Sequence, residues 1–170
     1  NNVMNIKKCI ERANLNVRDI ILEPIASADA VLSDEEKEAG IVLVDIGGGT
    51  TDIAIFQDGI IRHTAVIPFG GNIITNDIKE GCQIMQRHAE ALKIKYGSAS
   101  ASENKENEVV CIPGLRGREP KEITLKNLSS IIQARMEEII ELVNYEIKNS
   151  GYSKKLIGGI VVTGGGAQLK

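Results

Sequence analysis

The sequence predicts a mixed α/β domain, and three observations support this prediction. Three closely spaced strand candidates come first, at Ile41 to Ile46, Thr51 to Gln57 and Gly59 to Ile67. A long amphipathic helix runs through Leu128 to Ile147, and an apolar strand, Gly159 to Thr163, then leads directly into glycines. Because the stretch "GGGTTD" bridges two strands, the pattern differs from a dinucleotide fingerprint, in which the glycines connect a strand to a helix.

Composition places the chain among soluble globular proteins. Its 170 residues suit one domain with a real core. Hydrophobic residues make up 42% and charged residues 25%, and the net charge is -3, which argues against disorder and against a basic nucleic-acid surface. Aromatic residues are only 3% and Trp is absent, so stacking on bases is not expected either. We therefore expect no nucleic-acid partner.

Cysteine and histidine give no sign of a metal site. The cysteines, at positions 9, 82 and 111, are odd in number and widely spaced, which suits ordinary thiols in a reducing cytosol. His63 and His88 stand alone, and isolated histidines are usually packing or surface residues.

Targeting and membrane signals are also missing from the sequence. No apolar run approaches the roughly 20 residues that cross a bilayer, and no signal peptide is visible. The chain starts without Met and ends on "GGGAQLK", where another helix should begin, so we expect a piece of a longer protein.

The first forty residues predict two helices. Apolar residues at helical spacing indicate a helix from Asn5 to Ala13, followed by an extended run from Arg18 to Leu22. Pro24 opens a second helix, Ile25 to Leu32, because Pro is well tolerated in a first turn. The acidic stretch "SDEEKEAG" predicts a solvated turn.

The three strands after this turn should form an antiparallel meander. Asp58-Gly59 is a strong signal for a two-residue type I′ hairpin, since both residues tolerate positive φ. The stretch "PFGG" then breaks the sheet, and Asn72 or Thr75 is placed to cap a helix that runs through Ile84. A further helix continues to Tyr96, where Gly97 ends it.

The next segment predicts a small insertion of β character. The stretch "SASASENKENE" is small and polar and reads as a flexible surface loop. Val109 to Ile112 predicts a short strand, "PGLRGREP" a turn, and Glu122 to Leu125 a second short strand or the entry to a helix.

The last third predicts the longest helix and a buried strand. Apolar residues recur every three or four positions from Leu128 to Ile147, and Asn149-Ser150-Gly151 ends the helix. The run "GIVVT" is typical of a strand that is buried on both faces.

The loop "DIGGGTTD" is the strongest candidate for a binding site. Successive N–H groups at Gly47, Gly48 and Gly49 can form an anion-binding concavity, and Thr50 and Thr51 add hydroxyl donors. The loop is preceded by Asp45, which would repel a phosphate unless a cation stood between them, so Mg²⁺ coordination, directly or through water, is its natural role. The alternative is a glycine-rich hairpin with its polar side chains in solvent.

Two more glycine clusters and one charged pair support a binding site. Gly70-Gly71-Asn72 begins a helix, where free N–H groups favour an anion, and Gly164-Gly165-Gly166 would let a flat ring or a ribose pack closely. Either cluster could instead be a plain strand-to-helix turn. Glu90 and Lys93, three residues apart on a helix, could hold ribose hydroxyls or form a surface ion pair. Because three glycine loops converge on one sheet edge, a ligand site is favoured.

The order of these motifs resembles the actin-like ATPase superfamily. "DIGGGTTD" looks like its second phosphate loop, "GGIVVTGGGAQL" like its adenosine motif, and "EPIASADAVL" like the helix that links the two halves of its fold. Within the superfamily, "IPFGGNIITNDI" and "AEALKIKYG" are most similar to the FtsA family of bacterial cell-division proteins. Chaperones of the superfamily would carry Glu where Asn72 stands.

The resemblance implies an actin-like ATPase (ribonuclease H-like) fold, a mixed sheet with flanking helices and a small inserted α/β subdomain. Residues 1–40 would be the tail of the first lobe and the connecting helix. Residues 41–97 and 127–170 would form the nucleotide-binding core of the second lobe, and residues 98–126 part of the inserted subdomain.

The resemblance also implies ATP and Mg²⁺ as cofactors. Asp45 would position the metal and a water molecule, the loop from Gly47 to Thr51 would hold the β- and γ-phosphates, and Gly164 to Gly166 would line the adenine. Gly71 and Asn72 would lie near the phosphates and ribose, Glu90 and Lys93 near the ribose and base, and Glu23 near the metal.

At the level of the parent protein, the resemblance implies an ATP-binding, at most slowly hydrolysing, cell-division protein. It would polymerise and link FtsZ filaments to the cytoplasmic membrane at the division site. The insertion would dock the C-terminal tail of FtsZ, and it is locally basic through Arg116, Arg118, Lys121 and Lys126. Other divisome proteins would be further partners. The first phosphate loop, the small subunit-contacting domain and the C-terminal membrane helix of the family are absent from this sequence.

Two rival functions remain open on the sequence. The chain could act as a peptide-binding module whose nucleotide site is incomplete without the first phosphate loop. It could also come from a sugar or acetate kinase of the same superfamily, although such enzymes build their acceptor site mostly from the first lobe.

Overall fold

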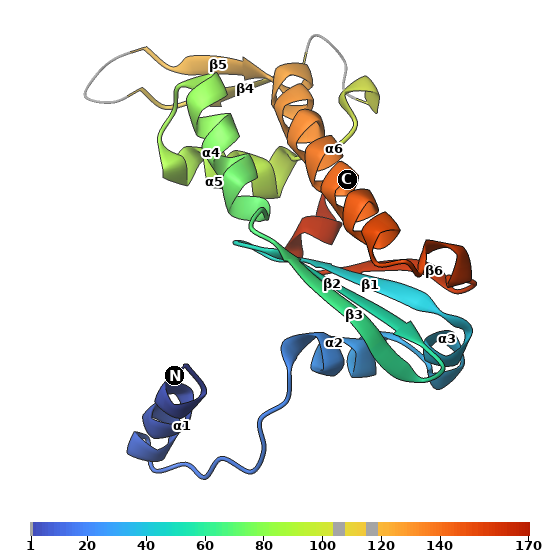
Figure 1. The fold of residues 1–170 in the computed structure, drawn as a ribbon. Helices are drawn as coiled ribbons and strands as arrows, with labels where there is room; N and C mark the ends of the chain where they lie inside the picture. Colours follow the sequence, from blue (N-terminus) through green and yellow to red (C-terminus); the bar gives the residue numbers. More distant parts are fainter. Residues whose placement is uncertain (1, 104–107, 115–118) are drawn as a thin grey trace.

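The computed structural model describes residues 2–103, 108–114 and 119–170 (Figure 1). In these ranges the helices are α1 (Asn2–Arg12), α2 (Glu23–Val31), α3 (Asp34–Ala39), α4 (Gly71–Cys82), α5 (Gln86–Tyr96) and α6 (Leu125–Asn149). The strands are β1 (Ile41–Ile46), β2 (Thr51–Gln57), β3 (Ile60–Ile67), β4 (Val109–Ile112), β5 (Lys121–Thr124) and β6 (Gly159–Thr163). Short 3-10 turns, η1 (Ala101–Glu103), η2 (Ser153–Lys155) and η3 (Gly165–Gln168), connect them.

The main sheet confirms the predicted meander. Its strand order is β3-β2-β1-β6. The strand β2 pairs antiparallel with both β1 and β3, and β6 pairs parallel with β1. Asp58 and Gly59 have φ values of 55° and 73°, as a type I′ hairpin requires. The sheet is therefore mixed, because the chain returns through α6 before it adds β6.

Helices cover both faces of this sheet, with α6 on one side and α2 on the other (Figure 1). Alternate residues of a strand point to opposite faces, so the apolar runs in β1 and β2 supply two cores. Val42, Val44 and Ile55 pack with Ile139 and Val143 of α6. The other face joins α2 to the sheet through Ala28, Leu32, Ile41, Leu43, Ala54 and Phe56.

A second layer stands beside the sheet and consists of α4, α5, the β4–β5 hairpin and the first half of α6 (Figure 1). Its fully buried residues include Ile74, Ile78, Leu128 and Ile132. Met136 packs against this cluster and also against the cluster under the sheet. The helix α6 therefore joins the two layers.

The acidic segment after α2 is a helix, not the solvated turn that the sequence predicts. The Ser33 side chain accepts a hydrogen bond from the Glu36 N–H, and the Glu36 carboxylate accepts one from the Ser33 N–H at 2.7 Å. This reciprocal capping box satisfies two N–H groups at the start of α3. Acidic residues in the first turn also suit the positive end of the helix dipole.

The strand β6 differs from its prediction as well. Ile160 is 54% exposed and Val162 is 47% exposed, so the strand is not buried on both faces. They lie beside Val42 and Val44 in the register, but β6 is at the edge of the sheet, where the packing is one-sided. An unbroken apolar run gives no information about whether a strand is central or at an edge.

The predicted helices near both termini are confirmed with small changes in their bounds. The first helix, α1, has no buried residue and stands away from the sheet (Figure 1). Part of the predicted flexible loop is ordered, since Ser98 is buried and Ala101–Glu103 forms a turn, while 104–107 lie outside the described residues. None of the helices in the described ranges is long and apolar enough to cross a bilayer.

Candidate functional site

The loop between β1 and β2 is a tight turn with an exposed rim. The Gly47 N–H donates to the carbonyl of Thr50 at 2.9 Å, which closes the turn. Gly48, Gly49 and Thr50 are exposed, and a Cβ on Gly49 would meet nothing within 4 Å. The rim therefore leaves open space over its backbone, as a phosphate cradle needs.

The carbonyls of this loop cap the start of α4. The Gly71 N–H donates to the Gly47 carbonyl at 2.9 Å, and the Asn72 N–H donates to the Gly48 carbonyl at 2.7 Å. The N-cap residue is Gly70, without a side-chain hydrogen bond, so the predicted capping by Asn72 or Thr75 is wrong. The two N–H groups expected to be free for an anion are already used within the protein.

Gly70 permits this close approach. A Cβ at this position would lie 2.6 Å from the Gly47 carbonyl oxygen and 2.9 Å from that of Gly48. No side chain fits there without movement of the backbone, so the glycine is required by the contact between the loop and α4.

The two threonines of the loop have different environments. Thr51 is fully buried, and its hydroxyl donates to the Phe69 carbonyl at 2.8 Å. Thr50 is exposed, and its hydroxyl donates to the Asp52 carboxylate at 2.9 Å. The Thr51 hydroxyl, which the sequence suggests as a phosphate donor, is therefore used in a hydrogen bond within the protein.

Asp45 is the second-last residue of β1 and lies beside a very small cleft. Its Oδ2 lies 3.5 Å from the Ser27 hydroxyl on α2, and Asp52 is its partner in the β1–β2 register. Glu23 lines the same cleft, whose volume of about 10 Å³ leaves room for at most about one water. In the part of the chain that the structure describes, no group of three or more His, Cys, Asp or Glu side chains could hold a metal.

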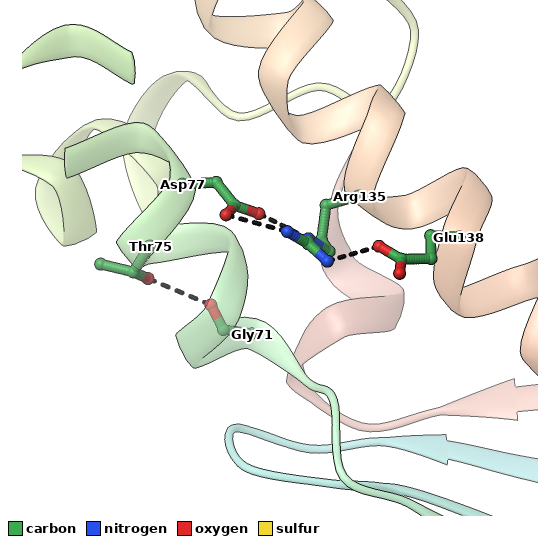
Figure 2. Close-up of polar contacts among 5 residues, drawn as sticks. All are labelled: Gly71, Thr75, Asp77, Arg135 and Glu138. Carbon is green, nitrogen blue, oxygen red and sulfur yellow. Dashed lines mark hydrogen bonds and ion pairs between the residues drawn. The ribbon is translucent and has the colours of Figure 1, made fainter. Parts of the chain in front are cut away.

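Glu90 and Lys93 on α5 form a network with α4. The Lys93 ammonium donates to the Gly71 carbonyl at 2.9 Å and to the Thr75 hydroxyl at 2.8 Å, and it lies 2.9 Å from Glu90 Oε2. Thr75 also contacts both Gly71 and Glu90, and Figure 2 shows its bond to Gly71. Partial burial raises the pKa of Glu90, but the hydrogen bonds from Thr75 and Lys93 and the lysine charge outweigh burial and lower this pKa overall.

A pocket of about 640 Å³ lies between the sheet loops and the second layer, in the size range of small-molecule sites. Eight of the fifteen residues that the sequence singles out line it, namely Gly47, Gly48, Gly71, Asn72, Glu90, Lys93, Gly165 and Gly166. The other seven do not line it, namely Glu23, Asp45, Gly49, Thr50, Thr51, Gly70 and Gly164.

The far wall of the pocket was not singled out from the sequence as a binding surface. It consists of the end of α5 with the two residues after it, the first residue of α6 and the end of the chain, namely Ile94, Lys95, Tyr96, Gly97, Ser98, Leu125, Gln168, Leu169 and Lys170. A Cβ on Gly97 would lie 2.9 Å from Leu169 Cδ2, and the Ala99 N–H donates to the Lys170 carbonyl at 2.6 Å. The glycine before "SAS" is the one signal in the sequence for this close contact.

The glycines after β6 serve packing as well as the pocket. Gly164 has a φ of 90°, and a Cβ there would lie 2.4 Å from Asp45 Oδ1. A Cβ on Gly166 would lie 2.3 Å from Ile46 Cγ2. These glycines bring η3 against the end of β1, next to the phosphate-loop candidate.

An ion-pair cluster holds α4 against α6 (Figure 2). Arg135 on α6 donates to both carboxylate oxygens of Asp77 on α4, at 2.6 and 3.0 Å, and also pairs with Glu138. Its guanidinium lies 5.8 Å from the centre of the Phe69 ring. The segment that leads into α4 is therefore fixed from both the sheet and α6.

Comparison with protein families gives two matches. The family model described as "Cell division protein FtsA" matches residues 42–170, and the model described as "Hsp70 protein" matches residues 2–67. The cell division protein FtsA of Pseudomonas aeruginosa is 46% identical over 166 residues, which cover 98% of this chain and 40% of that protein. The FtsA protein of Bacillus subtilis is 41% identical over 165 residues, covering 97% of this chain and 37% of its own length.

Solved structures show the same fold. MreB5 of Spiroplasma citri bound to ADP has a TM-score of 0.80 at 26% identity and covers 98% of this chain and 54% of its own. The MamK filament has a TM-score of 0.71 at 16% identity, covering 98% of this chain and 52% of its own, which supports the fold alone. The chain spans about 40% of the length of the curated relatives that it matches. Its actin-like fold and the family match over residues 42–170 together show that the chain belongs to the FtsA family of cell division proteins.

Proposed function

We propose that this chain supplies the second-lobe half of an ATP site in an actin-like cell-division protein. The observation that carries the proposal is the pocket of about 640 Å³, which has the Gly47–Gly48 loop at one side and Gly165 and Gly166 at another. Glycine-rich backbone with open space suits phosphates, and the apolar side chains of Tyr96 and Leu169 in the far wall suit a base.

Two related structures support a nucleotide ligand. The MreB5 protein of Spiroplasma citri was solved with ADP, and a second structure of it, 27% identical with a TM-score of 0.75, was solved with AMPPNP. Both cover 98% of this chain.

The residues of the chain fit such a ligand. Gly48, whose exposed backbone lines the pocket, would face the phosphates, and Asp45 would hold Mg²⁺ through water, since Mg²⁺ keeps several waters in most sites. Bound Mg²⁺ would neutralise phosphate charge. Asp45 would orient water, and with no stronger base beside it, we expect hydrolysis to be slow if it occurs.

The function of the parent protein is part of the same proposal. The family supports a role in cell division at the division site. We propose that the parent polymerises on ATP and links FtsZ filaments to the inner face of the cytoplasmic membrane through a helix outside this sequence. In this scheme residues 1–40 belong to the first lobe, 41–97 and 127–170 to the nucleotide core of the second, and 98–126 to an inserted subdomain.

We place the FtsZ tail on the β4–β5 side of the second layer. A cleft of about 410 Å³ lies there between the α4–α5 turn and the hairpin, with Ile84, Met85 and Ile112 as apolar lining and Lys121 at its edge. Lys121 and Lys126 are exposed, which suits an acidic peptide, while Arg116 and Arg118 lie outside the described residues.

The substitution Asp45→Ala tests the nucleotide proposal. In the full-length parent protein, calorimetric titration with Mg-ATP should show affinity at least about tenfold weaker than in the wild type, because a metal-positioning carboxylate is lost. Asp19→Ala is the control, since Asp19 is exposed and its carboxylate accepts a hydrogen bond from the neighbouring Ile20 N–H. Equal Mg-ATP affinity in the wild type and Asp45→Ala would contradict the proposed ATP site with Asp45 as its metal-positioning residue.

A further inference from the structure

The three ammonium protons of Lys93 all have partners inside the protein. A lysine has three N–H donors and no acceptor, and the acceptors here are the Gly71 carbonyl, the Thr75 hydroxyl and the Glu90 carboxylate, at 2.9, 2.8 and 2.9 Å. The side chain is only 12% exposed. A direct hydrogen bond from Lys93 to a ligand hydroxyl would therefore break one of these buried contacts.

The contact with Gly71 continues to the phosphate-loop candidate. Gly71 accepts from Lys93 through its carbonyl and donates through its N–H to the Gly47 carbonyl at 2.9 Å. The next N–H, that of Asn72, reaches the Gly48 carbonyl at 2.7 Å. One set of hydrogen bonds thus runs from α5 through the first turn of α4 to the loop. A Cβ added at residue 71 would lie 3.3 Å from the ammonium nitrogen, so the glycine leaves this contact uncrowded.

Glu90 differs from Lys93 in exposure. Its side chain is 42% exposed, and one oxygen, Oε2, carries the contacts to Thr75 and Lys93. Both residues line the pocket, but only the glutamate combines an accessible surface with an acceptor for the hydroxyl groups of a sugar.

We propose that Lys93 is a positioning residue, which holds the start of α4 and hence the Gly47–Gly48 loop, and that the ribose hydroxyls are held by Glu90 without Lys93. This inference rests on the proposed function for the identity of the ligand. The sequence suggests that Glu90 and Lys93 hold the ribose together, whereas in this proposal Glu90 contacts the ligand and Lys93 holds the protein around it.

Removal of the ribose hydroxyls separates the two roles in the full-length protein. The variant Lys93→Met should bind both ATP and 2′,3′-dideoxy-ATP more weakly, by about tenfold, because the loop that faces the phosphates loses its support. Glu90→Gln should weaken ATP more than dideoxy-ATP. Lys79→Met is the matched control, since Lys79 on α4 pairs with the neighbouring Glu80 and does not line the pocket. Unchanged affinity of Lys93→Met for dideoxy-ATP would overturn the proposal, because it is the result that a direct ribose contact gives.

Hydrogen exchange provides a readout that needs no ligand. In Lys93→Met, the amides of Gly71 and Asn72 should exchange at least about tenfold faster than in the wild type, while the amides of β2 stay protected. Lys93→Gln, which keeps a neutral donor, should fall between the two and serves if Lys93→Met does not fold. Unchanged exchange at Gly71 and Asn72 contradicts the positioning role. Failure of the wild type to bind ATP, with faster exchange in the variant, would instead overturn the nucleotide proposal and leave the support role in place.

Discussion

For single residues, burial decides which polar atoms remain available to a ligand. Thr50 and Thr51 are neighbours in a loop whose sequence offers two equal hydroxyls, yet only Thr50 is exposed. The same difference separates Glu90 from Lys93, at 42% and 12% side-chain exposure. A spacing rule places such residues on one helix face, but it does not show how deep each one lies.

The pH dependence of stability tests the environment of Glu90. Because its folded pKa lies below the usual 4.5, the ionised carboxylate stabilises the fold above that value, and this contribution disappears as the pH falls through the folded pKa. Urea unfolding at several pH values should show the wild type more stable than Glu90→Gln near neutral pH. The difference should begin to shrink below about pH 4.5, where the carboxylate of the unfolded chain becomes neutral, and should be lost once the pH falls through the lower folded pKa.

Glu141→Gln on the exposed side of α6 provides the comparison for general charge effects. If the difference between the wild type and Glu90→Gln is the same at every pH, the network does not hold an ionised carboxylate.

Among the contacts between elements, the one between the β1–β2 loop and α4 fixes the position of the phosphate-loop candidate. The carbonyls of Gly47 and Gly48 cap the helix, Thr51 anchors the preceding segment at Phe69, and Gly70 leaves room for both. The loop and the helix start form one unit, although more than twenty residues separate them in the sequence. A ligand that moves the loop would act directly on α4.

Two glycine-to-alanine substitutions test this unit. Gly70→Ala should lower the free energy of unfolding by about 2 kcal/mol or more, since the new Cβ would lie 2.6 Å from a backbone oxygen. Gly49→Ala should change it by less than about 0.5 kcal/mol, because that Cβ would enter open space. Urea denaturation of the two variants measures both, and equal effects would mean that the loop does not rest on α4 as described.

At the scale of the whole molecule, the pocket lies where the two layers meet. The sheet side contributes Gly47, Gly48, Gly165 and Gly166, and the second layer contributes the start of α4 and the last turns of α5. Since α6 joins both layers, and Arg135 ties it to α4, the pocket and the β4–β5 hairpin belong to one packed body. The first helix is separate from it, with no buried residue.

A charge reversal on the hairpin tests the proposed partner surface. Lys121→Glu should weaken the binding of an FtsZ C-terminal tail peptide by at least about threefold, since a cation at the edge of the cleft becomes an anion. Calorimetry with the full-length protein measures this. Lys154→Glu, which reverses an exposed lysine in η2, should leave binding unchanged. If the two variants bind the peptide alike, the β4–β5 surface is not where the tail docks.

The sequence by itself determined the elements and the family. The β1–β2–β3 meander, the Asp58-Gly59 hairpin and the long helix follow from local periodicity and turn chemistry, which act between near neighbours. The sequence also singled out residues that the fold brings together, since eight of the predicted site residues line one pocket.

Only the tertiary structure decided which of those groups face the pocket. The caps on Gly71 and Asn72, the burial of Thr51 and the support from Lys93 depend on partners far away in the chain. The far wall at Gly97 and Leu169 and the half-exposed β6 depend on which elements become neighbours. Local patterns record what a residue prefers, whereas access to a ligand is set by long-range packing.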